Sequence, residues 1–183
     1  MEQRKNNKKI LLHACCAICS GYPIRYLRDN GYEPVVYFYN PNIYPQDEYQ
    51  RRLEAQRQLC KHYDVELVEG EYEPDDFFNA AAGLEDEPER GLRCDKCFEL
   101  RLKNTLKKAK ELGIDTITTS IVISPHKNYS KITEIGTKLC GAENINYLGI
   151  DFKKKDGFLK TNMISRELGL YRQNYCGCKF SIR

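Results

Sequence analysis

The chain has 183 residues, of which 41% are hydrophobic and 30% are charged, and this balance predicts one folded domain with little disorder. Its net charge of +3 gives no general argument for binding nucleic acid. The basic start of the chain is followed by too few apolar residues for a signal peptide or a membrane span. We therefore expect a cytoplasmic protein with no membrane partner.

Nine cysteines are present, and they are the most unusual feature of the composition. An odd number cannot pair completely, and disulfides are rare in a reducing compartment, so a structural disulfide framework is not expected. Cys60 and Cys140 stand alone among apolar residues and are expected to be small packed side chains. The other seven form three groups: Cys15, Cys16 and Cys19; Cys94 and Cys97; Cys176 and Cys178. Metal or redox chemistry is the leading interpretation of these groups.

Strands and helices are expected to alternate along the chain. The apolar run of residues 10–13 is typical of a buried strand, and the first cysteine group follows it, where a helix should begin. The spacing of apolar and turn residues predicts further strands at 35–39, 65–68, 116–119 and 145–150. Between and after them it predicts helices at about 20–29, from 47 to about 62, at about 77–82, from 94 to 112, through 132–139 and from 156 to about 169. Asp47 is the expected N-cap of the helix that begins there.

This alternation predicts an α/β fold, namely a single Rossmann-like domain whose mostly parallel sheet has helices on both faces. Open sheets of this kind bind ligands at the carboxyl ends of their strands. The first cysteine group and the loops at 40–45 and 124–128 all follow predicted strands, so we expect them to line one crevice. Residues 156–183 are expected to form a C-terminal extension that returns Cys176 and Cys178 to this active site.

Cys16 with Cys19, and Cys94 with Cys97, each have the spacing Cys-x-x-Cys at the start of a predicted helix. There the free backbone N–H groups and the helix dipole favour thiolates and any anionic cluster that they hold. Four thiolates can bind one structural zinc ion or an iron–sulfur cluster, and seven grouped thiols exceed what one tetrahedral zinc ion can use. Our assignment leaves Cys19 for a neighbouring metal or a supporting contact and places the cluster on Cys15, Cys16, Cys94 and Cys97. Spacing alone does not decide this division.

Cys176 and Cys178 suit a different role. Gly177 between them allows the chain to fold tightly enough for the two sulfur atoms to meet, and the small ring that a disulfide would close is strained and therefore reducible. This favours electron transfer over structural cross-linking. The alternative is that both cysteines are additional metal ligands.

Five stretches of the sequence together resemble one family. They are His13-Ala14-Cys15-Cys16-Ala17-Ile18-Cys19-Ser20, Asn40-Pro41-Asn42-Ile43-Tyr44-Pro45, Arg93-Cys94-Asp95-Lys96-Cys97, Ser124-Pro125-His126 and Tyr171-Arg172-Gln173-Asn174-Tyr175-Cys176-Gly177-Cys178. In this order, over nearly the whole chain, they are similar to the QueH family of cobalamin-independent epoxyqueuosine reductases. The last stretch is specific, whereas each Cys-x-x-Cys alone is weak. The family pattern usually has Pro at the position of Ala17, a difference expected to affect loop stiffness more than sulfur chemistry.

The resemblance implies a HUP-type domain, a [4Fe-4S] cluster with a second iron as a further possibility, and reduction of epoxyqueuosine to queuosine at the wobble position of tRNA. It also implies that the metallocofactor is held at the positions of Cys15, Cys16, Cys94 and Cys97, and that the redox candidates are Cys176 and Cys178. Removing the epoxide oxygen takes two electrons. The implied partners are therefore tRNA carrying epoxyqueuosine and an external electron donor.

His126, in a loop at a strand end, is the candidate proton donor, whereas His13 is interpreted as a core histidine. The loops at 40–45 and 124–128 and the C-terminal extension supply the candidate substrate-binding residues: Asn40, Asn42, Tyr44, Ser124, Arg172, Gln173, Asn174 and Tyr175. Basic clusters within 4–9, 103–110 and 153–155 are interpreted as solvated surface, with contact to tRNA phosphates as the alternative.

Two other functions remain open at this point. A cluster-dependent tRNA sulfur-transfer enzyme would have a similar fold, but such enzymes carry a Ser-Gly-Gly-x-Asp-Ser loop for ATP phosphates where this chain has residues 15–21. A zinc-stabilised RNA-binding module without catalysis would tolerate the loss of Cys176 and Cys178 and would bind zinc through Cys16, Cys19, Cys94 and Cys97.

Overall fold

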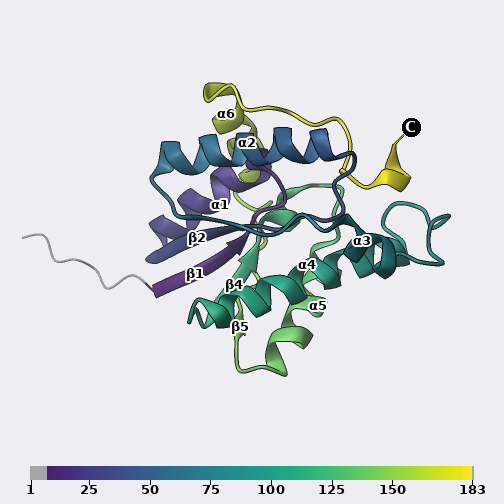
Figure 1. Cartoon of the computed structure of the whole chain (residues 1–183). Coiled ribbons are helices and arrows are strands. Elements are labelled where there is room, and N and C mark those ends of the chain that lie inside the picture. Colours follow the sequence, from purple (N-terminus) through teal and green to yellow (C-terminus); the bar gives the residue numbers. More distant parts are fainter. Residues whose placement is uncertain (1–7, 183) are drawn as a thin grey trace, which may run out of the picture.

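The strand β1 (Lys8–His13) lies at the centre of a sheet of five parallel strands in the computed structural model, which describes residues 8–182 (Figure 1). The strand order is β3-β2-β1-β4-β5, and the remaining strands are β2 (Tyr32–Phe38), β3 (Leu67–Glu69), β4 (Thr116–Thr119) and β5 (Asn146–Tyr147). The prediction of an α/β fold around a parallel sheet is confirmed.

Helices cover both faces of this sheet. The helices α1 (Ala17–Asp29), α2 (Gln46–Tyr63) and α6 (Gly157–Glu167) contribute to the hydrophobic cluster on one face, and α4 (Leu92–Glu111) and α5 (Tyr129–Gly141) to the cluster on the other (Figure 1). The short helix α3 (Pro74–Ala80) lies beside α4. No helix among residues 8–182 is long and apolar enough to cross a membrane.

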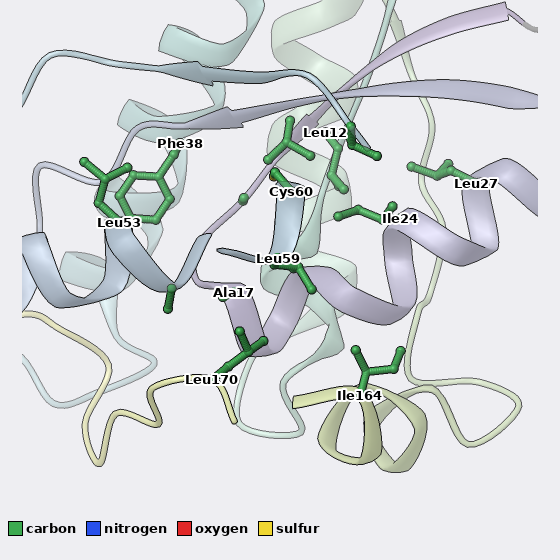
Figure 2. Packing of buried hydrophobic residues seen from close by; sticks show 14 of the residues in the cluster. Leu12, Ala17, Ile24, Leu27, Phe38, Leu53, Leu59, Cys60, Ile164 and Leu170 are labelled. Atoms are coloured by element: carbon green, nitrogen blue, oxygen red, sulfur yellow. The ribbon is translucent and has the colours of Figure 1, made fainter. Parts of the chain in front are cut away.

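Alternation along β1 explains why both faces are buried. Ile10 and Leu12 belong to the cluster with α1 and α2, whereas Leu11 between them belongs to the cluster with α4, and all three are fully buried. Figure 2 shows Leu12 among side chains of α1, α2 and α6. A parallel strand covered on both faces has a continuous apolar sequence, which is why residues 10–13 were recognisable as a strand.

Several helix and strand ends differ from the predictions. The first helix begins at Ala17 and not near residue 20, because the Cys16 side chain caps it by accepting from the backbone N–H of Cys19. Asp47 is not an N-cap, since the cap position of α2 is Pro45 and the Asp47 carboxylate instead pairs with Arg51. The prediction for Asp47 is therefore wrong.

The last strand is shorter than expected. β5 spans only Asn146–Tyr147, because the backbone N–H of Ile150 turns back to the carbonyl of Leu148 and ends the extended conformation predicted for 145–150. β4 ends at Thr119, whose side chain accepts from the N–H of Ile121 and starts the 3-10 helix η1 (Ser120–Ile123). Both turns direct the chain away from the sheet.

The strand order places the cysteine loop at a switch point of the sheet. From β1 the chain continues to β2 and β3 on one side, and it returns to β4 and β5 on the other side of β1. The loop after β1 therefore lies next to η1, which follows β4, and the backbone N–H of Cys15 donates to Ser120 Oγ (3.1 Å). In open α/β sheets this position forms a ligand crevice.

A substitution at Gly136 would test how closely α5 packs on the sheet. A Cβ atom there would lie 2.4 Å from Cε2 of Tyr147, whereas a Cβ at Gly141 of the same helix would meet nothing within 4 Å. We expect Gly136→Ala to lower the free energy of unfolding by about 1–3 kcal/mol, because the Tyr147 ring is packed against the core. Gly141→Ala, the matched control, should change it by less than about 1 kcal/mol in urea unfolding. Equal effects of the two substitutions would contradict this packing.

Candidate functional site

A cavity of about 1020 Å³ opens at the carboxyl edge of the sheet. All three cysteine groups line it, namely Cys15, Cys16, Cys19, Cys94, Cys97, Cys176 and Cys178. The two lone cysteines do not line it: Cys60 is 2% exposed and Cys140 is 1% exposed, each in a hydrophobic cluster, and Figure 2 shows Cys60 in the core. The sequence grouping therefore separates the cysteines of the cavity from those of the core.

Three of these thiols form a compact triad. The Sγ atoms of Cys15, Cys16 and Cys19 all lie within 4.8 Å of one another, at the junction between β1 and α1. The pKa of the Cys15 thiol is well below its usual value, mainly because of hydrogen bonding with Cys16 and Cys19, with further help from the hydroxyl of Ser120 (3.4 Å). Such a triad can hold a metal ion, because thiolates are the ligand form of cysteine.

Cys94 in the first turn of α4 and Cys97 in the second line the same cavity but are not part of the triad. Cys94 is half-buried, and its Sγ accepts from the backbone N–H of Arg90 (3.3 Å). Cys97 is buried in a cluster that contains Cys178, and this burial raises the pKa of its thiol. The structure thus brings Cys19 nearest to Cys15 and Cys16, and the predicted set with Cys94 and Cys97 extends across the cavity.

Cys176 and Cys178 form an asymmetric pair. Hydrogen bonding with Cys178 is the main cause that lowers the pKa of Cys176 to about 5, and the same interaction raises the pKa of Cys178. Gly177 between them has a φ of +103°, a conformation that favours glycine. The pair therefore combines a thiolate with a neighbouring thiol, the form in which one sulfur can attack and the other can complete a disulfide.

Sequence reasoning missed Arg101, one of the buried arginines in the wall of the cavity. Arg101 is only 6% exposed, and its Nη1 donates to Asn40 Oδ1 (3.3 Å), but within residues 8–182 it forms no ion pair with a carboxylate. Its charge contributes to the low pKa of Cys15. A signal was present, because Arg101 follows Cys97 by four residues and so shares its helix face.

His13 joins three strand ends and does not line the cavity. Its Nε2–H donates to the carbonyl of Tyr39 (3.0 Å), so Nδ1 accepts from the hydroxyl of Thr119 (3.0 Å). Burial, and secondly the charge of Arg101, lower the pKa of His13 to about 4. The interpretation of His13 as a satisfied core histidine agrees with these contacts.

Acid should therefore destabilise the fold through His13. The unfolded state binds a proton at this residue below pH 6.5 and the folded state only below about 4, so stability is lost as the pH falls through that window. The loss at this residue amounts to about 3 kcal/mol. Urea unfolding between pH 7 and pH 4.5 should show it in the wild type and in the control His62→Gln, whereas His13→Gln should have a flatter profile. If stability depended on pH in the same way in all three proteins, His13 would not be the cause of the loss.

His126 lines the rim of the cavity and is exposed. Its Nδ1 accepts from Nη2 of Arg90 (3.2 Å), since a guanidinium can only donate, and the proton of the neutral ring is then on Nε2. Six of the candidate substrate-binding residues also line the cavity: Asn42, Ser124, Arg172, Gln173, Asn174 and Tyr175.

Two of the candidate substrate-binding residues do not line it. Asn40 is 1% exposed, and its Nδ2 donates to the carbonyl of Ala14 (2.9 Å), so it ties β2 to the cysteine loop. Tyr44 packs on Phe78, with Lys179 over its ring. By contrast, Oδ1 of Asn42 is buried in the cavity wall without a hydrogen-bond partner among residues 8–182.

Three lysines of the basic clusters form ion pairs on the surface. Lys8 pairs with Asp115, Lys108 with Glu111 and Lys110 with Glu143, while Arg4 and Lys5 of the first cluster lie outside the described residues. These three pairs agree with the interpretation as solvated surface.

The fold and the cavity define an α/β protein whose parallel sheet carries a thiol-rich site, suited to a metal ion, at its carboxyl edge. The family described as "Epoxyqueuosine reductase QueH" matches residues 10–183. The chain belongs to the epoxyqueuosine reductase QueH family, and the resemblance seen in the sequence is confirmed.

Curated relatives agree with this assignment. The epoxyqueuosine reductase QueH of Staphylococcus epidermidis is 40% identical over an alignment that covers 98% of this chain and 79% of that protein. The protein of the same name from Streptococcus pyogenes serotype M1 is 38% identical and aligns with 100% of this chain and 73% of its own length. The one from Thermotoga maritima is 33% identical, with 94% and 90% covered.

Solved structures share the fold at low identity. The U34-tRNA thiolase NcsA from Methanococcus maripaludis, solved with its [4Fe-4S] cluster, has a TM-score of 0.60 at 16% identity, and the match covers 98% of this chain but 63% of that chain. A predicted subunit of tRNA methyltransferase from Methanocaldococcus jannaschii has a TM-score of 0.58 at 13% identity, with 85% and 74% covered. These similarities confirm the Rossmann-like, HUP-type architecture.

Proposed function

We propose that this chain reduces epoxyqueuosine at the wobble position of tRNA to queuosine. Family membership supports the substrate, and the observation that carries the chemistry is the gathering of seven thiols from three distant parts of the chain in one cavity. The reaction adds two electrons and two protons to the epoxide, breaks both carbon–oxygen bonds, and leaves a double bond and water. It needs an electron source, a proton source and a pocket for one extruded nucleoside.

The first two cysteine groups are the proposed metal ligands. We assign a [4Fe-4S] cluster to Cys15, Cys16, Cys94 and Cys97 and a second iron to the side of Cys19. The close triad, the low pKa of Cys15 and the buried charge of Arg101, which has no carboxylate partner in the described part of the chain, all suit an anionic metal–thiolate centre. When bound, the cluster supplies single electrons and an iron that can act as a Lewis acid.

Cys176 and Cys178 are the proposed redox pair. Closure of their disulfide releases two electrons and two protons, which equals the demand of the reaction, and an external electron donor then restores the two thiols. The thiol–thiolate asymmetry of the pair supports this role over that of two extra ligands. The proximity of Cys178 to Cys97 gives the electrons a short path toward the metal site.

The cavity rim is the proposed nucleoside site. Nε2–H of His126 is free to donate a proton toward the departing oxygen, and the buried Oδ1 of Asn42 is placed to accept from a hydroxyl or amine of the substrate. Ser124 and the stretch Arg172 to Tyr175 would contact the base, the sugar or the adjoining phosphates. For Asn40 and Tyr44 we now propose support of the loop instead of substrate contact. A tRNA substrate implies a cytoplasmic location.

The two competing functions differ from this proposal in measurable ways. A sulfur-transfer enzyme needs a phosphate-binding loop for ATP, and residues 15–19 are instead occupied by the thiol triad and the start of α1. A zinc-stabilised RNA-binding module would be colourless and would not need Cys176 and Cys178.

Anaerobic purification with iron, sulfide and zinc analysis, followed by incubation with epoxyqueuosine-containing tRNA and dithionite, tests the proposal. We expect about four or more irons per chain, a visible band that dithionite bleaches, and conversion of the modified nucleoside detected by mass spectrometry. About one zinc ion with no colour after reconstitution, or an intact epoxide beside a fully loaded cluster, would overturn it.

A further inference from the structure

The segment that carries Cys176 and Cys178 has no regular secondary structure between α6 and the 3-10 helix η2 (Lys179–Ser181). It crosses from α6 past the end of α2 toward α3 (Figure 1). A segment of this kind needs specific contacts to hold two thiols in one arrangement. Those contacts converge on one arginine of α2.

Arg52 uses three nitrogen atoms to hold this segment. Its side chain is 2% exposed, Nε donates to Oε1 of Glu48 (2.7 Å), Nη1 donates to the carbonyl of Cys176 (3.1 Å) and Nη2 to the carbonyl of Tyr175 (3.0 Å). The Tyr175 ring lies 5.1 Å from the guanidinium carbon. Only a planar guanidinium can reach a carboxylate and two successive carbonyls together, so lysine is no substitute.

Glu48 ties the beginning of the same segment. It is 3% exposed, and its Oε2 accepts from the hydroxyl of Tyr171 (2.7 Å) and from Nη2 of Arg51 (3.2 Å). The buried pair of Arg52 and Glu48 thus contacts both ends of residues 171–176. A buried ion pair contributes little net stability unless its hydrogen bonds are complete, and here each partner makes further bonds to the C-terminal segment.

Gly177 shows how closely the backbone passes this arginine. A Cβ atom at Gly177 would lie 2.9 Å from Nη1 of Arg52 and 3.0 Å from Cγ1 of Ile43. On the other side, the carbonyl of Gly177 accepts from the backbone N–H of Tyr44 (2.8 Å), and Cys178 forms an antiparallel bridge with Ile43. The backbone between the two cysteines is therefore held from both sides.

We propose that Arg52, oriented by Glu48, is a positioning residue that fixes Cys176 and Cys178 against Cys97 and so sets how readily the two thiols close to a disulfide. The proposal rests on the proposed function only in taking the pair to be redox-active. The reaction that reports it is one dithiol plus one oxidised glutathione giving one disulfide plus two reduced glutathiones.

The test compares Arg52→Lys with Arg57→Gln, an exposed arginine of the same helix that pairs with Glu69 away from the cavity. Two quantities are measured on the metal-loaded protein under anaerobic conditions. They are the equilibrium constant of Cys176–Cys178 disulfide formation in glutathione buffers, from mass spectrometry, and the amide hydrogen exchange of residues 171–178.

For Arg52→Lys we expect the equilibrium constant to fall and amide exchange to rise, each by about tenfold, as for the loss of one hydrogen bond to a charged group. Arg57→Gln should change neither. Unchanged values in Arg52→Lys, with circular dichroism and iron content equal to wild type, would overturn the proposal.

Tyr171→Phe serves if Arg52→Lys does not fold, because it removes one hydrogen bond to Glu48 and leaves the ion pair intact. It should shift both quantities in the same direction by about threefold, and no shift would again overturn the proposal. Failure of the proposed function would look different. Full reductase activity of Cys176→Ser would remove the redox role, while hydrogen exchange would still decide whether Arg52 positions the segment.

Discussion

Replacing Cys178 with serine is expected to reduce the kcat of epoxyqueuosine reduction by about a thousandfold or more, because a single thiol cannot release two electrons by closing a disulfide. Cys176→Ser should have the same effect, since the two sulfurs act as one unit. Conversion of tRNA-bound epoxyqueuosine is measured by mass spectrometry, once with dithionite and once with a dithiol reductant as the electron donor.

Iron content distinguishes the two roles considered for Cys176 and Cys178, namely a redox-active dithiol and a pair of additional metal ligands. Both serine variants should retain the iron of the wild type, and Cys140→Ala, a change at a buried cysteine outside the cavity, should keep both iron and activity. Loss of iron in Cys178→Ser would make the residue a metal ligand. Undiminished activity in either variant would exclude the disulfide step.

The second large effect is expected for Cys15→Ala, a variant that should lose nearly all of its bound iron. Cys15 contacts both other members of the triad, and its thiol has the lowered pKa that a ligand needs. Cys19→Ala should lose only the second iron, about one per chain, and retain a bleachable cluster. Iron and sulfide analysis after anaerobic purification, with a visible spectrum, separates the two outcomes.

Cys60→Ala is the matched control, because it removes a buried thiol of α2 that does not line the cavity. It should retain full iron. If Cys19→Ala loses the whole cluster while Cys94→Ala retains it, the ligand set is centred on the triad, and our division between Cys19 and Cys94 is wrong.

The order of the elements was predictable because each leaves a local pattern. Residues 10–12 are apolar without interruption since β1 is buried on both faces, and the stripe of Phe98, Leu102 and Leu106 marks the buried side of α4. Element ends were less predictable. Cys16 acts as an N-cap, a role for which a thiol is unusual. β5 ends early at a turn centred on Gly149, although the apolar residues on both sides of this glycine favoured a longer strand.

The cysteines of the cavity were identified because their spacing is itself the signal, whereas their supports were not. Arg52 and Glu48 lie 123 or more residues before the carbonyl and hydroxyl groups that they bind, and no periodicity connects such distant positions. Asn40 was assigned to substrate because polar loop residues usually face the crevice, yet its amide holds the backbone of Ala14. Hydrogen bonds across the fold decide these roles.

The wall of the cavity combines Cys15, near the beginning of the chain, with Cys178, near its end. During synthesis on a ribosome, β1, α1 and the three thiols of the triad emerge long before residues 171–178 leave the exit tunnel. A thiol triad exposed in this nascent state would be open to oxidation and to the wrong metal. We therefore expect stable cofactor insertion only after residues 171–178 have emerged, because these residues complete the wall of the cavity.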